Sequence, residues 1–208
     1  MYRIILASQS PRRKEIMTQM GIPYEAVDIH VVEEVDEKVN NTPSKLVKAL
    51  AMVKARAAAD RLKNEPDDLV IIGADTMVFH HGQAMGKPKD REDAAAMLMS
   101  LSDDIHEVYT GVCIIIRKRN GVHMNNHADE ISFSVGTKVA VGSLTMEQIE
   151  DYIDTGEPFD KAGAYAIQGG FGIYIREIQG DYYNIVGFPI AKIYEKLRDY
   201  GINIKKLK

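Results

Sequence analysis

Short apolar strands alternate with helix starts along this chain, and that order limits the folds open to it. Residues 2–7 are predicted to form a buried strand, after which Ser10 and Pro11 supply an N-cap and a proline at the first helical position. The apolar run 69–72 predicts a second buried strand, which is expected to end at 73–76. Strands interleaved with helices and hairpins predict an α/β protein with a mixed sheet.

The remaining elements are predicted from local capping and turn signals. Helices are expected from Thr42-Pro43, from Asp90 to about Leu101, from Thr145 with its capping-box partner Gln148 to near Gly156, and from Pro189 to about Tyr200. Strands are expected at 24–27, 107–117, 122–135 and 173–178, with hairpins at 77–85 and through Lys118–Gly121. Because no repeat or linker interrupts the chain, we expect a single domain over residues 1–208.

The charge balance and the single cysteine argue against several classes of protein. Basic residues number 26 and acidic residues 30, a net charge of −4, whereas a domain that binds duplex nucleic acid is basic. Extended nucleic acid is therefore not an expected partner. Cys113 stands in the apolar run 112–116, so we expect a buried strand residue, no internal disulfide and a reducing, cytoplasmic compartment. The longest uncharged stretch, 162–175, is glycine-rich and too short to cross a membrane, so no membrane contact is expected.

The segment Leu6–Arg13 has the features of an anion-binding site. A strand ends, small polar residues form a turn, and a helix begins with Arg12 and Arg13 in its first turn. Unpaired backbone N–H groups and the positive end of the helix dipole favour an anion there, and an anion would offset the unfavourable position of the two arginines. A solvated basic helix start explains the same residues, and the sequence leaves both interpretations open.

Two further charged residues follow strands or turns. Asp75 comes after the apolar strand 69–72, and ligands commonly collect at the carboxyl ends of strands in open α/β sheets. Its carboxylate could hold a divalent metal or orient a water molecule, but a strand-terminal Asp is also a common turn former. Lys87 lies between Gly86 and Pro88, and a loop lysine by itself indicates no function.

A stretch of small residues, 160–170, surrounds Gln168. Glycine in such a stretch permits close approach of the backbone to a ligand. The Gln168 amide carries both a donor and an acceptor, which match the amide edge of a nucleobase. Glycine-rich loops have many other uses, so this signal is weak alone.

No transition-metal site is predicted from the histidines. His80-His81 falls at a turn, and His123 and His127 are four residues apart in a strand-like segment, where this spacing does not bring them together. The chain has no His-Glu-x-x-His pattern and no cysteine partners for them.

Taken together, these segments resemble the Maf family of nucleoside triphosphate pyrophosphatases. The matching motifs occur in the family's order and span nearly the whole chain: Leu6-Ala7-Ser8-Gln9-Ser10-Pro11-Arg12-Arg13, Asp36-Glu37, Lys54-Ala55, Gly73-Ala74-Asp75-Thr76, Gly86-Lys87-Pro88, His106-x-Val108-x-Thr110-Gly111-Val112, 160–169, Gly180-Asp181-Tyr182 and Val186-Gly187-Phe188-Pro189. Only Gln9 and Phe188 depart from the usual residues, and neither departure removes a charged group. The resemblance implies an elongated mixed sheet flanked by helices, with a cleft between two lobes, akin to the inosine triphosphatases.

The resemblance also implies a reaction and a set of site residues. Water attacks the α-phosphorus of a nucleoside triphosphate and releases pyrophosphate. The residues implied to bind the substrate are Ser8, Arg12, Arg13, Lys54, Thr76, Lys87 and Gln168. Asp75 is implied as the proton acceptor and as a metal ligand, with Glu37 as the second metal-binding carboxylate. Mg²⁺ is the expected ion, and Mn²⁺ could replace it. Lys54 has an alternative interpretation, in which it lies on the partly buried face of its helix and has no role in substrate binding.

The residues at the specificity positions of the family, Arg12, Thr76 and Gln168, match the branch that acts on dTTP and UTP. Thymine and uracil share an N3–H donor flanked by carbonyl acceptors, which a glutamine amide can meet, although a flipped amide would equally meet cytosine. The alternatives are a nucleotide-binding regulator of cell division with little turnover and a pyrophosphatase of the 7-methyl-GTP branch. Members of the family are often dimers, so a homodimer is one expected assembly.

Overall fold

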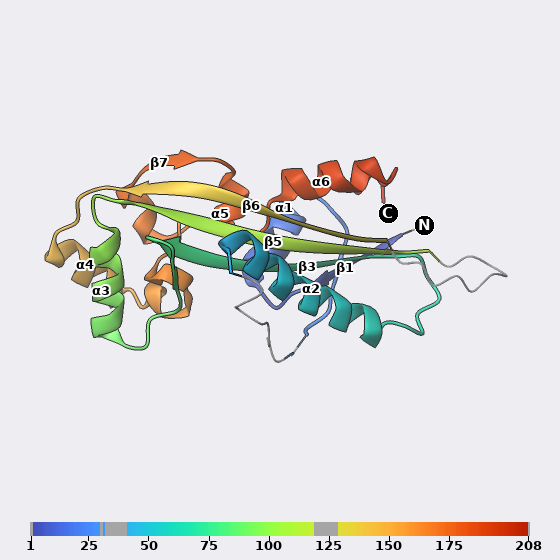
Figure 1. Ribbon diagram of the computed structural model, residues 1–208, viewed down its shortest axis with the longest axis horizontal. Coiled ribbons are helices and arrows are strands. Elements are labelled where there is room, and N and C mark those ends of the chain that lie inside the picture. The colour runs from blue at the N-terminus through green and yellow to red at the C-terminus, as the bar shows by residue number, and fades with distance from the viewer. Residues whose placement is uncertain (1, 30, 32–40, 119–128, 208) are drawn as a thin grey trace. The chain divides into compact units, whose positions relative to one another are not determined.

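Figure 1 shows the computed structural model, which describes residues 2–29, 31, 41–118 and 129–207. The chain forms two compact units: unit 1 contains Met1–Asp75, Thr110–Ser134 and Gly187–Lys208, and unit 2 contains Thr76–Tyr109 and Val135–Val186. The chain passes from one unit to the other at four points, of which three lie inside strands and the fourth lies between Val186 and Gly187. The expectation of a single domain with a cleft between two lobes stays a prediction.

A seven-stranded mixed sheet forms the framework, with the strand order β2-β1-β3-β5-β6-β7 and with β4 paired to β3. The strands are β1 (Arg3–Ala7), β2 (Glu25–Ala26), β3 (Leu69–His80), β4 (Gln83–Met85), β5 (Ile105–Arg117), β6 (Asp129–Val141) and β7 (Ile175–Gln179). Strand β1 runs parallel to β2 and β3, whereas β4 and β7 run antiparallel to β3 and β6. The predicted α/β class with a mixed sheet is confirmed.

Among the described residues, the helices other than α5 begin close to where their capping signals predict. They are α1 (Pro11–Gln19), α2 (Pro43–Arg61), α3 (Arg91–Leu101), α4 (Met146–Asp154), α5 (Tyr182–Val186) and α6 (Ile190–Asp199). The side chains of Thr42, Asp90 and Thr145 each accept a hydrogen bond from a backbone N–H in the first turn, and Gln148 completes the capping box. Helix α1 begins at Pro11 as predicted, but the Ser10 side chain makes no capping hydrogen bond. None of the helices among the described residues has the length and apolar character needed to span a membrane.

The sequence misplaces the ends of two strands. Strand β3 does not end at 73–76 but continues to His80, because its last residues pair with β4 in the predicted hairpin. Strand β6 extends to Val141, beyond the predicted end at residue 135, because it pairs with β7 from Lys138 onward. The predicted turn between β5 and β6 lies almost wholly outside the described residues. Helix α5 was not predicted, since five residues are too few to show a helical period.

The core of unit 1 lies between α2 and the strands beneath it (Figure 1). Buried alanines of α2 pack against apolar strand residues; the cluster comprises Ile5, Ala7, Ala51, Ala55, Ala58, Leu69, Ile71, Cys113 and Ile115. Cys113 is buried in β5, which confirms the strand assignment, and burial raises the pKa of its thiol to about 12. Small side chains on the helix let its backbone approach the sheet closely.

Two glycines on the strands lie in direct contact with the backbone of α2. A Cβ atom at Gly73 of β3 would lie 2.6 Å from the carbonyl oxygen of Ala51 in α2. A Cβ atom at Gly111 of β5 would overlap the backbone of Val47 and Lys48. The backbone of α2 therefore rests directly on β3 and β5, and only glycine fits at the two contact points.

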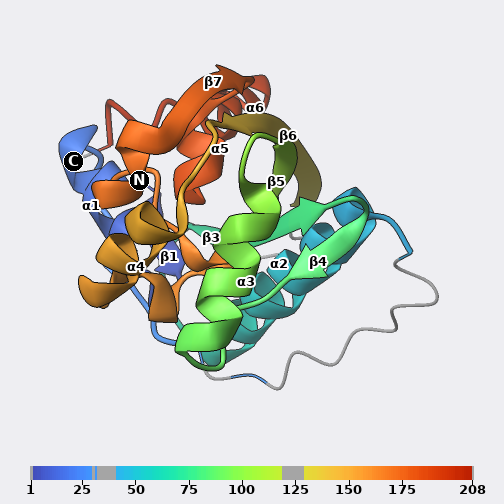
Figure 2. The same ribbon diagram turned by 90° about the vertical axis from the view of Figure 1, so that its left-hand side faces the viewer.

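The core of unit 2 is built around aromatic rings that cluster with buried residues of α3 and α4, the two helices toward the viewer in Figure 2. Phe171 lies at the centre, with its ring centroid 5.2 Å from that of Tyr152 and 5.0 Å from that of Tyr165. Leu98 and Ile149 are buried in the same cluster. Ring pairs at these separations add to the stabilisation from buried area alone.

The contact between α2 and β5 predicts that Gly111→Ala destabilises the protein. The methyl group would meet helix backbone rather than a movable side chain, so we expect the free energy of unfolding to fall by about 1–3 kcal/mol or more. Urea denaturation measures the change. Gly86→Ala is the matched control, because nothing lies within 4 Å of the added Cβ, and we expect a change within about 0.5 kcal/mol. Equal effects of the two substitutions would contradict the close packing of α2.

Candidate active site

An ion pair in unit 1 joins two of the predicted site residues. The Nζ atom of Lys54, on α2, lies 2.5 Å from Oδ1 of Asp75, on β3. The side chains are 17% and 13% exposed, so the pair is largely shielded from solvent. Gly73 lies two residues before Asp75 and faces α2, and strand alternation places Asp75 on the same face. The packing of α2 on the sheet thus brings the ammonium group to the carboxylate.

The predicted anion-binding turn between β1 and α1 is organised by Arg13. Its buried guanidinium donates from Nε to the carbonyl oxygen of Gly187 at 2.8 Å and from Nη1 to the Ser8 hydroxyl at 3.0 Å. The Ser8 hydroxyl also accepts a hydrogen bond from the backbone N–H of Ser10 at 3.2 Å. Arg13 therefore holds the turn together, a structural role that the sequence analysis did not assign to it.

Arg12, unlike Arg13, makes no contact within the described part of the chain that holds the turn together. It is half-buried, and no described residue forms a hydrogen bond or ion pair with its guanidinium. The first turn of α1 contains no acidic residue. Arg12 therefore differs from Arg13 in having no partner among the described residues for its hydrogen-bond donors.

The parallel pairing of β1 with β3 sets these two groups at the same end of the strands. Ala7, the last residue of β1, pairs with Gly73. The chain beyond Ala7 therefore begins its turn beside Ala74 and Asp75. Unit 1 thus brings Ser8 and the start of α1 to the end of the strand pair that carries the Asp75 carboxylate.

The other described site residues, Thr76, Lys87 and Gln168, belong to unit 2. Thr76 is half-buried on β3, and strand alternation directs it to the face opposite that of Asp75. Lys87 is exposed in the loop after β4, and Gln168 is exposed in a turn. A hydrogen bond of 3.0 Å from the N–H of Gly163 to the carbonyl oxygen of Gly86 ties the Lys87 loop to the segment that leads to Gln168. Glu37 lies outside the described residues.

Two contacts in unit 2 involve residues to which the sequence analysis gave no role. The Glu157 carboxylate accepts a hydrogen bond from the N–H of Gly170 at 3.0 Å, and so braces the turn that carries Gln168. His106 is 1% exposed, and its Nε2 lies 2.7 Å from the Tyr165 hydroxyl. Burial lowers the pKa of His106 to about 4, so its ring is neutral at pH 7. His106 lies within a quoted motif and Glu157 lies just before one, but no sequence signal gives their contacts.

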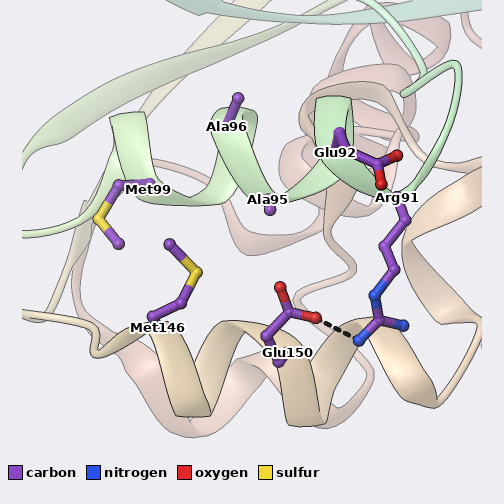
Figure 3. Close-up of a pocket in the computed structure, with 7 residues that line it drawn as sticks. All are labelled: Arg91, Glu92, Ala95, Ala96, Met99, Met146 and Glu150. Carbon is purple, nitrogen blue, oxygen red and sulfur yellow. Dashed lines mark hydrogen bonds and ion pairs between the residues drawn. The ribbon is translucent and has the colours of Figure 1, made fainter.

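A groove between α3 and α4 does not coincide with the candidate site (Figure 3). It has a volume of about 420 Å³ and is lined by Arg91, Glu92, Ala95, Ala96, Met99, Met146 and Glu150. Met99 and Met146 point toward each other across it, and Arg91 pairs with Glu150 and Asp154. Because Arg91, the cation among these lining residues, is already paired to two carboxylates, this groove is poorly suited to a polyanion.

Among the described residues, one group of three side chains has the donor types and spacing to hold a metal ion: His80, His81 and Asp104, all in unit 2. The structure places His80-His81 at a turn, as predicted, but adds a carboxylate from a distant part of the chain. The sequence alone could not place Asp104 there.

Comparison with known proteins identifies the family. The profile of the family Maf, described as Maf-like protein, matches residues 3–200. A dTTP/UTP pyrophosphatase of Lachnoclostridium phytofermentans is 44% identical over 206 residues, 99% of each chain. Proteins of the same name are 41% identical in Bacillus cereus (98% of each chain) and 44% identical in Alkaliphilus metalliredigens (98% of this chain and 100% of the other).

Among solved structures, a nucleoside-triphosphatase described as a dITP/XTP pyrophosphatase from Mycobacterium abscessus matches 69% of this chain and 76% of its own at 16% identity, with a TM-score of 0.37. A TM-score this low does not establish a shared fold. The family match and the relatives do not depend on it, and they extend over nearly the whole chain. The chain belongs to the Maf family.

Proposed function

We propose that this protein hydrolyses dTTP and UTP to the nucleoside monophosphate and pyrophosphate. Relatives that carry the name dTTP/UTP pyrophosphatase match it over 98–100% of their length. The observation that carries the proposal is the buried pair of Asp75 and Lys54 beside the turn that begins at Ser8. A fixed carboxylate next to anion-binding groups is what hydrolysis of a phosphate ester or anhydride requires.

The substrate brings about four negative charges, which the protein must match with cations. Arg12 offers a guanidinium that can grip a phosphate group with two parallel hydrogen bonds, and Lys87 offers an exposed point charge. Arg13 acts mainly by shaping the turn, so its contribution to binding is indirect in large part. Lys54 holds the Asp75 carboxylate and is proposed to contact a phosphate group as well.

Asp75 takes the proton of the attacking water in this proposal. The water oxygen forms a bond to the α-phosphorus as the bond from that phosphorus to the bridging oxygen breaks, and pyrophosphate leaves with the bonding electrons. The proton passes to a carboxylate oxygen of Asp75, whose position is fixed by the ammonium group of Lys54. A base held in place spends no free energy on orientation during the reaction.

A divalent metal ion fits the donor chemistry of the same position. Asp75 would hold it together with Glu37, and carboxylate oxygens and phosphate groups are the ligands that Mg²⁺ prefers. When bound, the ion would neutralise charge that builds up on the phosphate oxygens. Mn²⁺ could replace Mg²⁺ on the same ligands.

Gln168 is proposed to select the base. Its amide is exposed at the tip of a turn that the Glu157–Gly170 hydrogen bond holds in shape. The amide can accept from N3–H and donate to a carbonyl oxygen of thymine or uracil. Arg12 and Thr76 complete the proposed specificity set. The cytoplasmic location and the homodimer expected from the sequence stay predictions.

The first experiment measures pyrophosphate release from dTTP, UTP, CTP, ITP, dGTP and 7-methyl-GTP in the presence of Mg²⁺. We expect fast release from dTTP and UTP alone. Release mainly from ITP or 7-methyl-GTP would support the proposed reaction but contradict the proposed role of Gln168 in selecting the base. Tight binding without release from any triphosphate would favour a nucleotide-binding regulator, which needs the cations but has no use for Asp75.

Replacing the proposed base separates turnover from binding. We expect Asp75→Asn to lower kcat by at least about 100-fold, the range of a lost general base, while binding of dTTP changes little. Single-turnover kinetics and equilibrium binding measure the two effects, and the melting temperature reports whether loss of the negative charge beside Lys54 disturbs the fold. Asp60→Asn, which alters an exposed carboxylate on α2, is the control and should retain full activity. A rate near that of the unchanged protein in Asp75→Asn would rule out the assignment.

Lys87 gives a test of the triphosphate contact that is independent of folding. Because the side chain is exposed and pairs with no described residue, Lys87→Ala should not lower stability. We expect kcat/KM for dTTP to fall by about 10-fold or more, since the phosphates lose a charged partner. Lys89→Ala removes a neighbouring exposed lysine and should leave kcat/KM nearly unchanged. Equal losses in the two variants would indicate a general effect of charge rather than a contact.

A further inference from the structure

His80, His81 and Asp104 converge on one point in unit 2. The Nε2 atoms of both histidines lie 3.0 Å from the same oxygen, Oδ2 of Asp104. The two rings lie side by side, with centroids 4.0 Å apart and planes tilted by 33°. The three donor atoms all fall within 4.8 Å of one another. No role in the proposed hydrolysis uses these residues.

The histidines are held by a tight hairpin turn. His80 pairs with Gln83 across the β3–β4 hairpin, which leaves His81 and Gly82 as the two turn residues. Both have left-handed backbone, with φ of 48° and 77°. Positive φ at both positions is typical of a type I′ turn, which prefers Asn-Gly. The turn therefore does not itself require histidine at position 81.

The carboxylate is equally well fixed. Asp104 Oδ1 accepts a hydrogen bond from the N–H of Ile105 at 2.7 Å, which leaves Oδ2 directed at the histidines. The backbone is anchored on both sides: the N–H of Asp103 donates to Gly142 and the N–H of Val141 donates to Asp104, each at 3.0 Å. Two backbone-anchored turns thus present three ligand atoms that need little rearrangement.

We propose that His80, His81 and Asp104 bind a transition-metal ion of the zinc type. Tetrahedral coordination at about 2.0–2.1 Å separates neighbouring ligand atoms by about 3.3 Å, close to the 3.0 Å between each histidine Nε2 and Oδ2 of Asp104. Two imidazole nitrogens and one carboxylate oxygen supply three ligands, as in zinc sites that keep one position for water. The His80 side chain is 10% exposed and anchors the site, whereas His81 is 72% exposed and leaves it open to solvent.

This site is chemically different from the one proposed for hydrolysis. Imidazole ligands favour Zn²⁺, Co²⁺, Ni²⁺ and Cu²⁺, whereas Mg²⁺ prefers oxygen ligands alone. The inference therefore does not depend on the proposed function, and failure of either leaves the other intact.

The test is metal binding by the full chain after removal of bound metal with a chelator. Zn²⁺ is titrated calorimetrically in excess Mg²⁺, and Co²⁺ is titrated while its visible absorption reports tetrahedral nitrogen and oxygen coordination. We expect one Zn²⁺ per chain at this site, undisturbed by Mg²⁺, and displacement of Co²⁺ by Zn²⁺. Absence of binding at micromolar Zn²⁺ would overturn the proposal.

His81→Asn is the decisive variant, because asparagine suits the left-handed turn position and removes the ligand without straining the hairpin. We expect an unchanged melting temperature without metal and at least a tenfold loss of Zn²⁺ affinity. Asp104→Asn should also weaken binding. The double variant His123→Asn/His127→Asn, which alters histidines outside the described residues, should bind as the unchanged protein does.

Three results would contradict the assignment. Full affinity in His81→Asn would mean that the three side chains form only a hydrogen-bonded cluster. Loss of binding in His123→Asn/His127→Asn would place the ion on those histidines instead. Loss of Zn²⁺ binding in Asp75→Asn, with binding retained in His81→Asn, would place the ion at the candidate active site.

Discussion

The direct contact of α2 with strands β3 and β5 is the constraint on which unit 1 depends. Gly73 and Gly111 remove the side chains that would hold the helix away from the sheet. That proximity allows Lys54 to reach Asp75, since a lysine on a more distant helix would lie beyond the carboxylate's range. A packing requirement and a proposed catalytic geometry thus rest on the same two glycines. Gly73 also stands two residues before Asp75, so the strand's alternation turns the carboxylate toward the helix.

Much of the fold could be predicted because helix starts are encoded locally. Thr42, Asp90 and Thr145 each cap the helix that follows them, and each signal lies within four residues of its partner. The predicted end of β3 was wrong because that end is determined by distant segments rather than by local signals. Gly73 to Thr76 have the composition of a turn, but pairing with neighbouring strands keeps the segment extended, and those partners are far away in the sequence. Tertiary context overrode local preference there.

The candidate site was predicted from the resemblance more than from its residues. Asp75 and Lys87 carried weak signals, and nothing local indicated that Lys54 reaches Asp75 or that Arg13 braces a turn. The cluster of His80, His81 and Asp104 was missed because a turn histidine pair looks ordinary until a distant carboxylate joins it. Contacts between remote segments are the part of a site that a single sequence does not reveal.

The hydrogen bond from Arg13 to Gly187 has a consequence for how the protein is made. Unit 1 is assembled from three separate stretches of chain, and Gly187 opens the last of them. The ribosome therefore completes α1 long before it adds Gly187, the acceptor for Arg13, and the last residue of unit 2, Val186, comes directly before that acceptor. Until then the Arg13 guanidinium lacks its hydrogen bond to the carbonyl oxygen of Gly187, and the turn at Ser8 is held less firmly than in the complete protein. A growing chain cannot bring the β1–α1 turn to its final form until translation has passed Gly187.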